Sequence, residues 1–493
     1  MPREDKTMEK LKFRVADYGA VGDGVTDDGP AISRAAAAAA AAAGEKAVVF
    51  EPKTYRILDL PAENRRHCLF SFEGTTDLHI EGNGAILLFK GANRLLSLEG
   101  GRRFALDGLT VDYQPKPFIL AKAEALDMEQ GYMDMAAEED IGLQGVTYLP
   151  PPPCFMFPNR ADIRYHYFIR EIRRLGDKRY RLVIRSDFIE RMGQVKPGDE
   201  FLLPTIGGSH LAGAACTIYD TDGFTLSNLR FYSHPEFGFD VRDCRGEMRF
   251  DHVALRQKEG AREQLVSWRD GFHIKDNRDP IVWDSCDIGP IGDDAFNLSC
   301  VHLDVTEVSA DERGIRCLPA EKGKTRDIAP GDEFVAYDLE TGRAFGEARV
   351  ARVFPSSEDV RFEADRPLPG FRPGMQVAFY KFANPGFVVR NSTIEGTVRV
   401  RSSGVFENCR FDVFWVHVEN EFFVEGPIPR DITFRNCTFT TPYDADAKIF
   451  HVGTLGKNGL HNCAYKCKNI VLENCTFEKG TIDVEDGNEL IIR

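Results

Sequence analysis

Short apolar segments bounded by Asn, Asp and Gly recur along most of the chain. GNGAI begins at Gly82 and DGLTV at Asp107, an offset of 25 residues, while SNLRF begins at Ser227 and DHVAL at Asp251, an offset of 24. One such segment alone cannot bury its apolar face, but the stacked coils of a solenoid bury it against their neighbours. The repeat therefore predicts an all-β chain folded as a right-handed parallel β-helix.

One segment departs from this β pattern. Residues 28–43 are rich in alanine, with Asp27 or Asp28 as the N-cap, Pro30 in the first turn and Gly44 just beyond the end. An acidic cap, an early proline and a terminal glycine are typical of an α-helix. The sequence predicts a single N-terminal helix that caps the solenoid.

Two longer stretches, residues 114–213 and 302–382, interrupt the rhythm of the coils. Both contain alternating apolar and polar segments, and both contain the turn Pro-Gly-Asp-Glu-Phe, at 197–201 and 330–334. Pro-Gly turns between alternating segments are typical of β-hairpins, so we expect two related, barrel-like β modules. The expected parts are the cap and first coils (12–113), the first module (114–213), the middle coils (214–301), the second module (302–382) and the C-terminal coils (383–493).

The middle and C-terminal coils can be aligned on a small residue followed by an inward apolar one. Because side chains alternate across a strand, one residue of each aligned segment should stack inside while the next points outward and can meet a substrate. The predicted inward row is Phe239, Phe272, Phe296, Val398 and Val416, and the predicted outward, substrate-binding row is Asp240, His273, Asn297, Arg399 and His417.

Three aspartates accompany this row. Asp270 and Asp294 are 24 residues apart, one coil, so their carboxyl groups should lie about 5 Å apart, with Asp293 flanking the same cleft. Adjacent aspartates alone are more often turn caps, but a third at the matching position of the next coil favours a site. Carboxyl groups this close cannot all ionise freely, so at least one pKa should rise. A protonated carboxyl for the leaving oxygen and a carboxylate to activate water are what glycoside hydrolysis needs, so the trio predicts a glycoside hydrolase.

Composition narrows the choice of ligand. Hydrophobic residues make up 43% of the chain, enough for an ordered core, and 62 Lys and Arg stand against 77 acidic residues without any basic cluster. Nucleic acid and polyuronates are therefore poor partners, and an oligosaccharide of neutral sugars fits better. No apolar run is long enough for a signal peptide or a membrane span, which predicts a cytoplasmic chain as given, or a periplasmic or secreted one if a leader has been removed.

Cysteine usage predicts neither disulfides nor a metal centre. Most of the 12 cysteines lie in strand-like segments, which favours buried thiols over a disulfide framework. Cys463 and Cys467 have His461 nearby but lack the second ligand pair of a zinc site. We expect no metal and no cofactor.

Several motifs resemble known β-helix enzymes. Residues 17–28, followed by a helix and residues 48–55, resemble the opening of the pectate-lyase-like superfamily. The segment Asp-Gly-Phe-His-Ile at 270–274, followed by Gly-Asp-Asp-Ala at 292–295, resembles the aspartate triad of family 28 polygalacturonases. It is more similar still to family 110 glycoside hydrolases, the inverting α-1,3-galactosidases. Two further segments, 110–118 and 423–427, also resemble family 110.

The resemblance implies roles for individual residues. Asp293 would be the general acid, Asp270 and Asp294 would hold the attacking water, and Glu425 would bind substrate. The Gly-His-Gly motif and the Arg-Ile-Lys clamp of polygalacturonases are missing, which argues against a galacturonate substrate. The chain departs from family 110 after residue 295 and at 399–401, positions that would line the sugar pocket, so the sugar and its linkage stay open.

These patterns predict an inverting, exo-acting, α-galactosidase-like hydrolase that removes a terminal galactose or modified galactose. His234 and Glu236, in Ser-His-Pro-Glu-Phe, can hydrogen-bond sugar hydroxyls or belong to a surface loop. A glycosidase for sulfated or uronic sugars is the nearest alternative, because Arg399 and Arg401 can pair with an anionic group. A lyase or epimerase and a non-catalytic carbohydrate-binding β-helix are the other candidates, and the sequence is compatible with a homo-oligomer.

Overall fold

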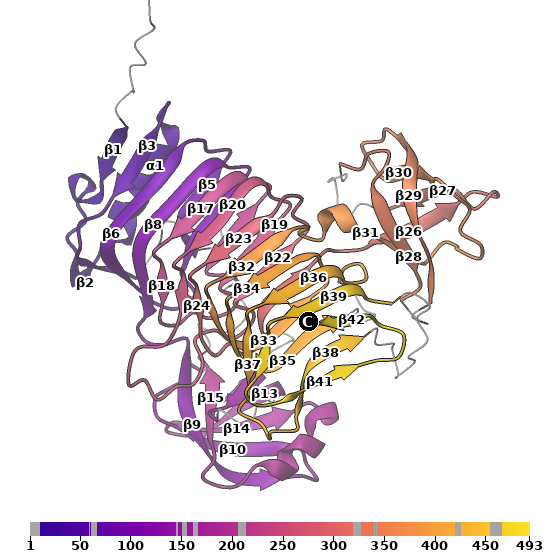
Figure 1. Cartoon of the computed structure of the whole chain (residues 1–493). Helices are drawn as coiled ribbons and strands as arrows, with labels where there is room; N and C mark the ends of the chain where they lie inside the picture. Colours follow the sequence, from indigo (N-terminus) through magenta and orange to yellow (C-terminus); the bar gives the residue numbers. More distant parts are fainter. Residues whose placement is uncertain are drawn as a thin grey trace, which may run out of the picture. The chain divides into compact units, whose positions relative to one another are not determined.

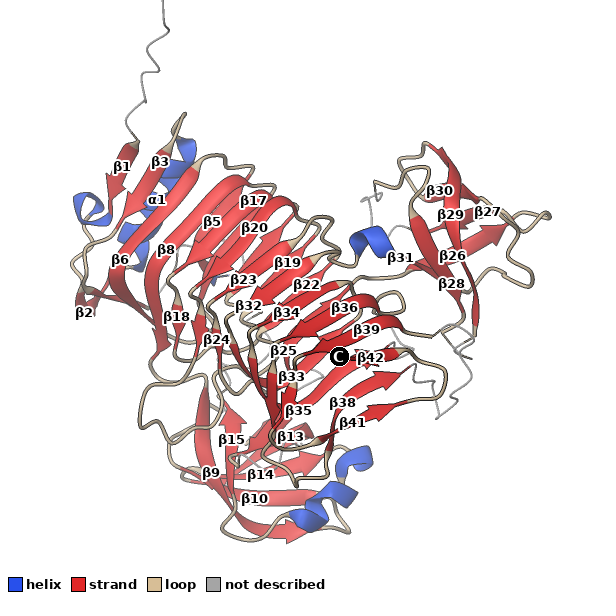
Figure 2. Cartoon of the chain, viewed as in Figure 1, coloured by secondary structure: helices blue, strands red, loops and turns tan. Residues whose placement is uncertain are grey.

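The chain folds as a right-handed parallel β-helix with two small inserted barrels, as the sequence predicts (Figures 1 and 2). The computed structural model describes residues 10–58, 60, 67–143, 146–149, 155–160, 166–205, 213–318, 327–339, 341, 343–419, 425–453 and 466–493. It divides into two units. The first comprises Met1–Asp240, Phe250–Gly271 and Cys286–Asp294, and the second comprises Val241–Arg249, Phe272–Ser285 and Ala295–Arg493.

Strands of the first unit pair in parallel so that similar apolar residues lie over one another. Val48, Ile80, Leu106 and Leu226 form one such column and are all buried. One series of strands is β1 (Leu11–Arg14), β3 (Lys46–Val49), β6 (Leu78–Phe89), β8 (Arg102–Tyr113) and β17 (Asp222–Ser227). Another is β5 (Cys68–Glu73), β7 (Arg94–Glu99) and β16 (Cys216–Tyr219). The third contains β2 (Asp23–Asp27), β4 (Thr54–Ile57), the second halves of β6 and β8, β18 (Arg230–Phe231), β21 (Ala254–Leu255) and β24 (Asp287–Ile288).

The predicted helix is confirmed as α1 (Gly29–Ala41), which packs against β1, β3 and β5 of the first coils (Figure 1). It ends before Gly44, because Ala42 is already extended. Asp28 occupies the N-cap position, but its carboxylate accepts hydrogen bonds from the backbone of Val21 and Gly22 rather than from the helix. The aspartate therefore ties the preceding loop to the helix.

Both inserts are rings of six antiparallel strands. In the first, the pairings run β9–β10–β14–β13–β12–β15 and return to β9, with β11 attached to β13. Its strands are β9 (Phe118–Asp127), β10 (Tyr132–Ala137), β11 (Thr147–Tyr148), β12 (Phe155–Pro158), β13 (Tyr167–Gly176), β14 (Arg179–Ile184) and β15 (Glu200–Pro204). The second ring, in the second unit, runs β26–β27–β30–β29–β28–β31. Its strands are β26 (Leu303–Val308), β27 (Gly314–Cys317), β28 (Glu333–Tyr337), β29 (Ala344–Phe354), β30 (Val360–Ala364) and β31 (Gln376–Phe379).

The two rings share one topology. Numbered in chain order within each ring, both have the strand order 1-2-5-4-3-6. The expectation of two related modules is therefore confirmed at the level of topology, and we keep the five-part division of the chain as a proposal.

The second unit is also built of coils. One series is β23 (Ile281–Asp284), β32 (Phe387–Arg390), β34 (Gly404–Glu407), β36 (Arg430–Arg435), β39 (Lys468–Glu473) and β42 (Leu490–Ile492). The others pair β22 (Phe272–Lys275) with β25 (Asp294–Ser299), and β33 (Thr393–Val400) with β35 (Arg410–Glu419), β37 (Thr438–Thr440), β38 (Lys448–Gly453), β40 (Thr476–Phe477) and β41 (Thr481–Val484). Three strands, β19 (Phe239–Arg242), β20 (Arg245–Asp251) and β25, carry residues of both units.

The recurring asparagines form a ladder along the C-terminal coils. Asn391, Asn408, Asn436 and Asn474 all have positive φ, between 51° and 54°, a conformation that Asn adopts more readily than most residues. The side-chain amides connect neighbouring coils, with Asn436 donating to Asn408 at 3.0 Å. The repeated asparagine thus marks the same bend in each coil.

Two further expectations concern cysteines and membranes. All ten cysteines in the described part of the chain are free thiols, and nine of them are buried. His461 and Cys463 lie outside the described residues. Among the described helices, none is long and apolar enough to cross a bilayer.

Stacked aromatic rings fill the interior of the second unit, which allows a test of the coil packing. Phe434 is fully buried, and its ring lies 4.8 Å from that of Phe406, with an interplanar angle of 9°. We expect Phe434→Ala to lower the free energy of unfolding by about 3–5 kcal/mol. Denaturant unfolding followed by circular dichroism measures the loss. The neighbouring half-buried Thr433→Ala is the control and should cost less than about 1 kcal/mol; equal effects would contradict the assigned core.

Candidate active site

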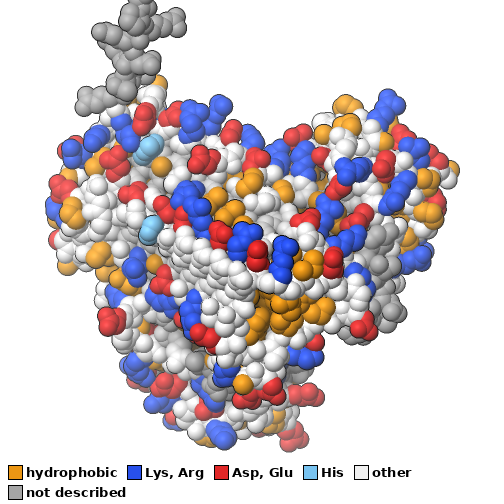
Figure 3. All heavy atoms as spheres, viewed as in Figure 1, with side chains coloured by type: hydrophobic (Ala, Val, Ile, Leu, Met, Phe, Trp, Pro, Cys, Tyr) orange, Lys and Arg blue, Asp and Glu red, His pale blue; other side chains and the backbone are white. Residues whose placement is uncertain are grey.

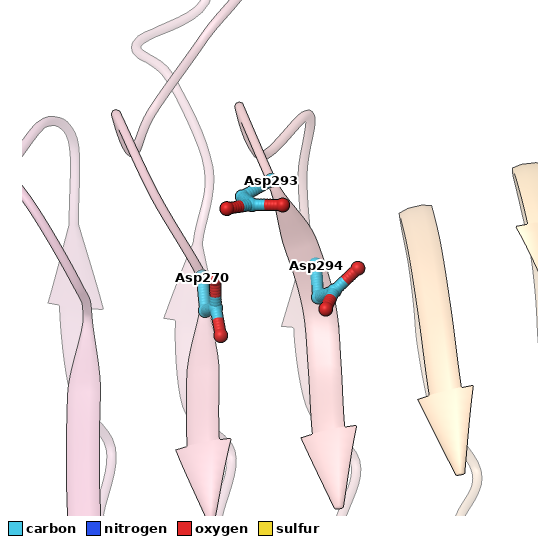
Figure 4. A group of neighbouring side chains, drawn as sticks. All are labelled: Asp270, Asp293 and Asp294. Atoms are coloured by element: carbon cyan, nitrogen blue, oxygen red, sulfur yellow. The ribbon is translucent and has the colours of Figure 1, made fainter. Parts of the chain in front are cut away.

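The three predicted aspartates lie together in the first unit. One carboxylate oxygen from each of Asp270, Asp293 and Asp294 lies within 4.8 Å of the others (Figure 4). The backbone N–H of Gly271 donates to the carbonyl oxygen of Asp294 at 2.8 Å, so parallel pairing holds the two strands in register. The proximity predicted from the 24-residue offset is confirmed, whereas the catalytic roles of the three residues stay a prediction.

The environments of the three carboxyl groups differ. Asp270 and Asp294 are only 2% and 4% exposed, whereas the side chain of Asp293 is 40% exposed. Burial penalises the ionised form of a carboxyl group, and a nearby negative charge penalises it further. The arrangement therefore combines two desolvated carboxyl groups with one that water reaches.

Arg269 adds a positive charge that sequence reasoning missed. Its Nε lies 3.9 Å from Oδ2 of Asp293, and its guanidinium carbon lies 4.6 Å from the centre of the Phe237 ring. Cation–π and ionic contacts together fix the orientation of the guanidinium. An arginine next to an aspartate in a turn looks like an ordinary solvated residue in the sequence, so no signal distinguished it.

The first barrel packs against the turns that carry the aspartates. Phe157, on β12, lies 4.7 Å from the Trp268 ring in an edge-to-face contact. A Cβ at Gly292 would lie 2.4 Å from the Trp268 carbonyl oxygen and 2.9 Å from Cζ of Phe157. Only glycine fits there, so Asp293 follows a residue pressed between the coil and the barrel.

His234 and Glu236 are both buried in the first unit. His234 has no exposed surface, and burial lowers its pKa to about 3, so the ring is neutral and offers no face to a ligand in this conformation. Glu236 is 6% exposed, and burial raises its pKa to about 7 although Arg269 opposes the shift. The backbone carbonyl oxygen of Glu236 accepts a hydrogen bond from the Ser267 hydroxyl at 2.6 Å. This bond ties Glu236 to the coil that carries Asp270.

Asp240 is fixed by a residue that the sequence analysis did not single out. The Tyr219 hydroxyl donates a hydrogen bond to its carboxylate, and Asp240 is 7% exposed. Tyr219 lies on a neighbouring coil, and an isolated tyrosine in a strand gives no signal of such a contact.

In the second unit, the predicted outward row is found in register. His273 pairs with Asn297, and Arg399 pairs with His417. The inward residues Phe272 and Phe296 stack with ring centres 5.1 Å apart. The alternation of inward and outward side chains read from the sequence is therefore correct here.

Glu425 is held by buried cations of the second unit. Nζ of Lys275 lies 2.6 Å from one of its oxygens, and a guanidinium nitrogen of Arg401 lies 2.8 Å from the other. The Asn297 amide also donates to Glu425, at 3.2 Å. Burial raises the pKa of Glu425, but Lys275 and Arg401 outweigh it and hold the pKa well below its usual range. Arg401 thus neutralises a protein carboxylate.

The aspartate trio also has the spacing of a metal-binding set. Oxygen donors alone suit Ca²⁺ or Mg²⁺. Spacing alone does not show that an ion binds, and no other feature of the described residues points to one. The expected lack of a metal therefore stays a prediction.

The fold and the site define a parallel β-helix in which three aspartates cluster where two neighbouring coils meet. In keeping with this, the chain is 23% identical over 454 residues to α-1,3-galactosidase B of Akkermansia muciniphila, a match that covers 83% of this chain and 54% of that protein. The chain thus spans about half the length of this curated relative. The similarity to α-1,3-galactosidases that the motifs indicate is therefore found in an independent comparison. No protein-family model matches the chain.

Several solved structures show weak similarity to the chain. A family 28 exopolygalacturonase of Yersinia enterocolitica is 11% identical, with 98% of this chain and 70% of that chain covered and a TM-score of 0.38. An endo-xylogalacturonan hydrolase from Aspergillus tubingensis is 11% identical, with 97% and 100% covered and a TM-score of 0.33. The adhesin PfbA of Streptococcus pneumoniae is 13% identical, with 98% and 78% covered and a TM-score of 0.34. At these scores the likeness adds nothing to the fold described above.

The raised pKa of Glu236 has a measurable effect on stability. Its carboxyl group ionises near pH 4.5 in the unfolded chain but only near pH 7 in the folded one, so the folded state loses relative stability as the pH rises between these values. We expect the stability difference between Glu236→Gln and the parent to change by about 3 kcal/mol in favour of the variant across this range. Denaturant titrations at a series of pH values measure it, and a pH-independent difference would contradict the assignment.

Proposed function

We propose that this chain is an exo-acting, inverting glycoside hydrolase that removes a terminal α-linked galactose, or a modified galactose, from oligosaccharides. The observation that carries the proposal is the meeting of Asp270, Asp293 and Asp294 within 4.8 Å. Carboxyl groups in unequal environments supply the acid and the base that glycoside hydrolysis needs. The similarity to an α-1,3-galactosidase supports galactose as the sugar.

In this mechanism Asp293 protonates the leaving oxygen while Asp270 and Asp294 hold the attacking water. Asp293 has the side chain that solvent, and so a substrate, can reach, whereas the two buried carboxyl groups keep a fixed geometry. Pinned carboxylates lose little entropy when they orient a water for attack. The role of general acid that the family resemblance implies for Asp293 therefore agrees with the exposure of its side chain. The positive charge of Arg269 acts against this role, because it favours the ionised form of a nearby carboxyl group.

The spacing supports a second candidate mechanism. Carboxyl groups in retaining glycosidases are about 5–5.5 Å apart, whereas those of inverting enzymes are about 6.5–9.5 Å apart. The closest oxygens here lie within 4.8 Å, which favours a double displacement with retention. Inversion remains the leading proposal, because two carboxylates can hold one water between them, and the galactosidase family that the motifs resemble inverts.

Charge argues against the alternative of a sulfated or uronic substrate. Arg401 is buried and paired with Glu425, so it has little capacity for an anionic sugar. On the face seen in Figure 3, basic and acidic side chains are interspersed rather than gathered into a basic patch. A neutral sugar fits this surface better.

Proton NMR of the first anomer released from an aryl α-galactoside distinguishes the two mechanisms. Inversion gives β-galactose first, whereas retention gives α-galactose first.

Asp293→Asn should lower kcat by about 10²–10⁴-fold, because proton transfer to the leaving group is lost. Asp222→Asn is the control, because Asp222 begins β17 with a side chain that is 38% exposed, and this variant should turn over like the parent. Parent-like activity of Asp293→Asn would refute the mechanism, and ultraviolet absorbance from an unsaturated product would indicate a lyase.

A second measurement assigns the acid and the base. A 2,4-dinitrophenyl leaving group needs no proton, so the variant that lacks the acid should hydrolyse this substrate at a rate near that of the parent. A variant that lacks the base should stay slow with it and be rescued by azide, which replaces the activated water. We expect the first behaviour for Asp293→Asn and the second for Asp270→Ala; the opposite pattern would exchange the two roles.

A further inference from the structure

Four consecutive coils of the second unit place long polar side chains at one register position. Arg399 on β33 pairs with His417 on β35, His417 with His451 on β38, and His451 with Asp483 on β41. Their side chains are 19%, 19%, 15% and 33% exposed, so the row reaches the surface without being fully solvated. Two members of this row, His451 and Asp483, lie outside the set of residues identified from the sequence.

A buried carboxylate holds the imidazoles of this row. Glu419 has no exposed surface; Nδ1 of His417 lies 3.0 Å from its Oε1 and Nε2 of His451 lies 3.5 Å from its Oε2. Nδ1 of His451 lies 3.3 Å from the Asp483 carboxylate. At Gly453, the register partner of Glu419, a Cβ would lie 2.5 Å from the His451 ring. The coil thus omits a side chain where the His451 imidazole needs room.

Aromatic rings flank the row. The Trp415 ring lies 6.1 Å from that of His417 and 5.7 Å from that of Tyr443, and both Trp415 and Tyr443 are partly exposed. Trp268 and Trp283, the other tryptophans, are buried. A partly exposed indole beside oriented hydrogen-bonding groups is an amphipathic surface that the fold of the coil does not require.

We propose that Trp415, Tyr443, His417, His451 and Arg399 form a binding surface for a neutral pyranose ring. The apolar face of the sugar packs on the indole, and its hydroxyls meet the edge of His417 that points away from Glu419. The carboxylates Glu419, Asp483 and Glu485 accompany the cationic side chains, so the surface has no excess positive charge for a sulfate or carboxylate. The proposal rests on the proposed function only for the choice of a saccharide, because binding needs no hydrolysis.

Equilibrium binding tests this surface separately from catalysis. The probe is α-1,3-galactobiose, titrated into the Asp293→Asn variant of the 493-residue chain by calorimetry and by tryptophan fluorescence. Because the other tryptophans are buried, we expect the emission change on binding to come from Trp415 and to vanish in Trp415→Phe. This variant keeps an aromatic face, so its affinity should stay within about threefold of that of the Asp293→Asn chain. Trp415→Ala and His417→Ala should each raise Kd at least tenfold.

Arg410→Ala is the matched control. Arg410 lies on the same strand, β35, in an exposed pair with Glu478, and its loss should leave Kd unchanged. Circular dichroism confirms that each variant is folded. Unchanged affinity in Trp415→Ala and His417→Ala, failure of the probe to bind, or preference for a sulfated galactobiose would each overturn the proposal. If binding depends on Trp415 but the parent chain shows no turnover, the binding surface stands and the hydrolase proposal fails. If the parent chain turns over substrate but binding does not depend on Trp415, the hydrolase proposal stands and the binding surface fails.

Discussion

Parallel pairing in strict register is the constraint on which the rest of the molecule depends. A residue on one coil lies about 5 Å from its partner on the next, so a property that repeats with the coil becomes a column. Inside, the columns are apolar, such as Val48, Ile80 and Leu106 in the first unit. At the bends, asparagines form a ladder. On the outside, the same register brings Asp270 beside Asp294, and it aligns the imidazoles of His417 and His451.

Contacts with neighbouring structure hold in place the charged groups that register brings together. In the first unit, Phe157 of the inserted barrel presses on Gly292 and Trp268, which fixes the backbone from which Asp293 projects. In the second unit, Lys275 and Arg401 neutralise Glu425 from two sides. Breaking a buried pair of this kind costs far more than forming it gains, so such groups stay where the fold puts them. Precise placement of charge, rather than additional stability, is what these contacts contribute.

The sequence predicted features that repeat with the coil or carry a local signal, and it missed residues with neither. The solenoid, the inward row and the approach of Asp270 to Asp294 follow from offsets of about one coil, whereas α1 follows from its cap, its early proline and its alanine-rich composition. Arg269, Tyr219 and Glu419 act across coils or turns at positions with no periodic signal, so only coordinates connect them to the site. The shared Pro-Gly-Asp-Glu-Phe turn correctly indicated related modules although it precedes the sixth ring strand, β15, in one barrel and the third, β28, in the other. If strand 1 is exchanged with strand 4, strand 2 with strand 5 and strand 3 with strand 6, every strand of the ring 1-2-5-4-3-6 keeps the same neighbours. The third and the sixth strand therefore occupy equivalent places in the ring.

The distribution of cations bears on the class of ligand. Enzymes that bind anionic sugars need positive charge that is not already committed to protein carboxylates, because desolvating a paired arginine gains nothing for the ligand. In the second unit, Lys275 and Arg401 are buried against Glu425, and Arg399 lies 3.9 Å from the buried Glu419. In the first unit, Arg269 faces Asp293. These cations therefore face the chain's own carboxylates. Under the proposed function, recognition of a neutral sugar would rest mainly on imidazoles, amides and aromatic faces.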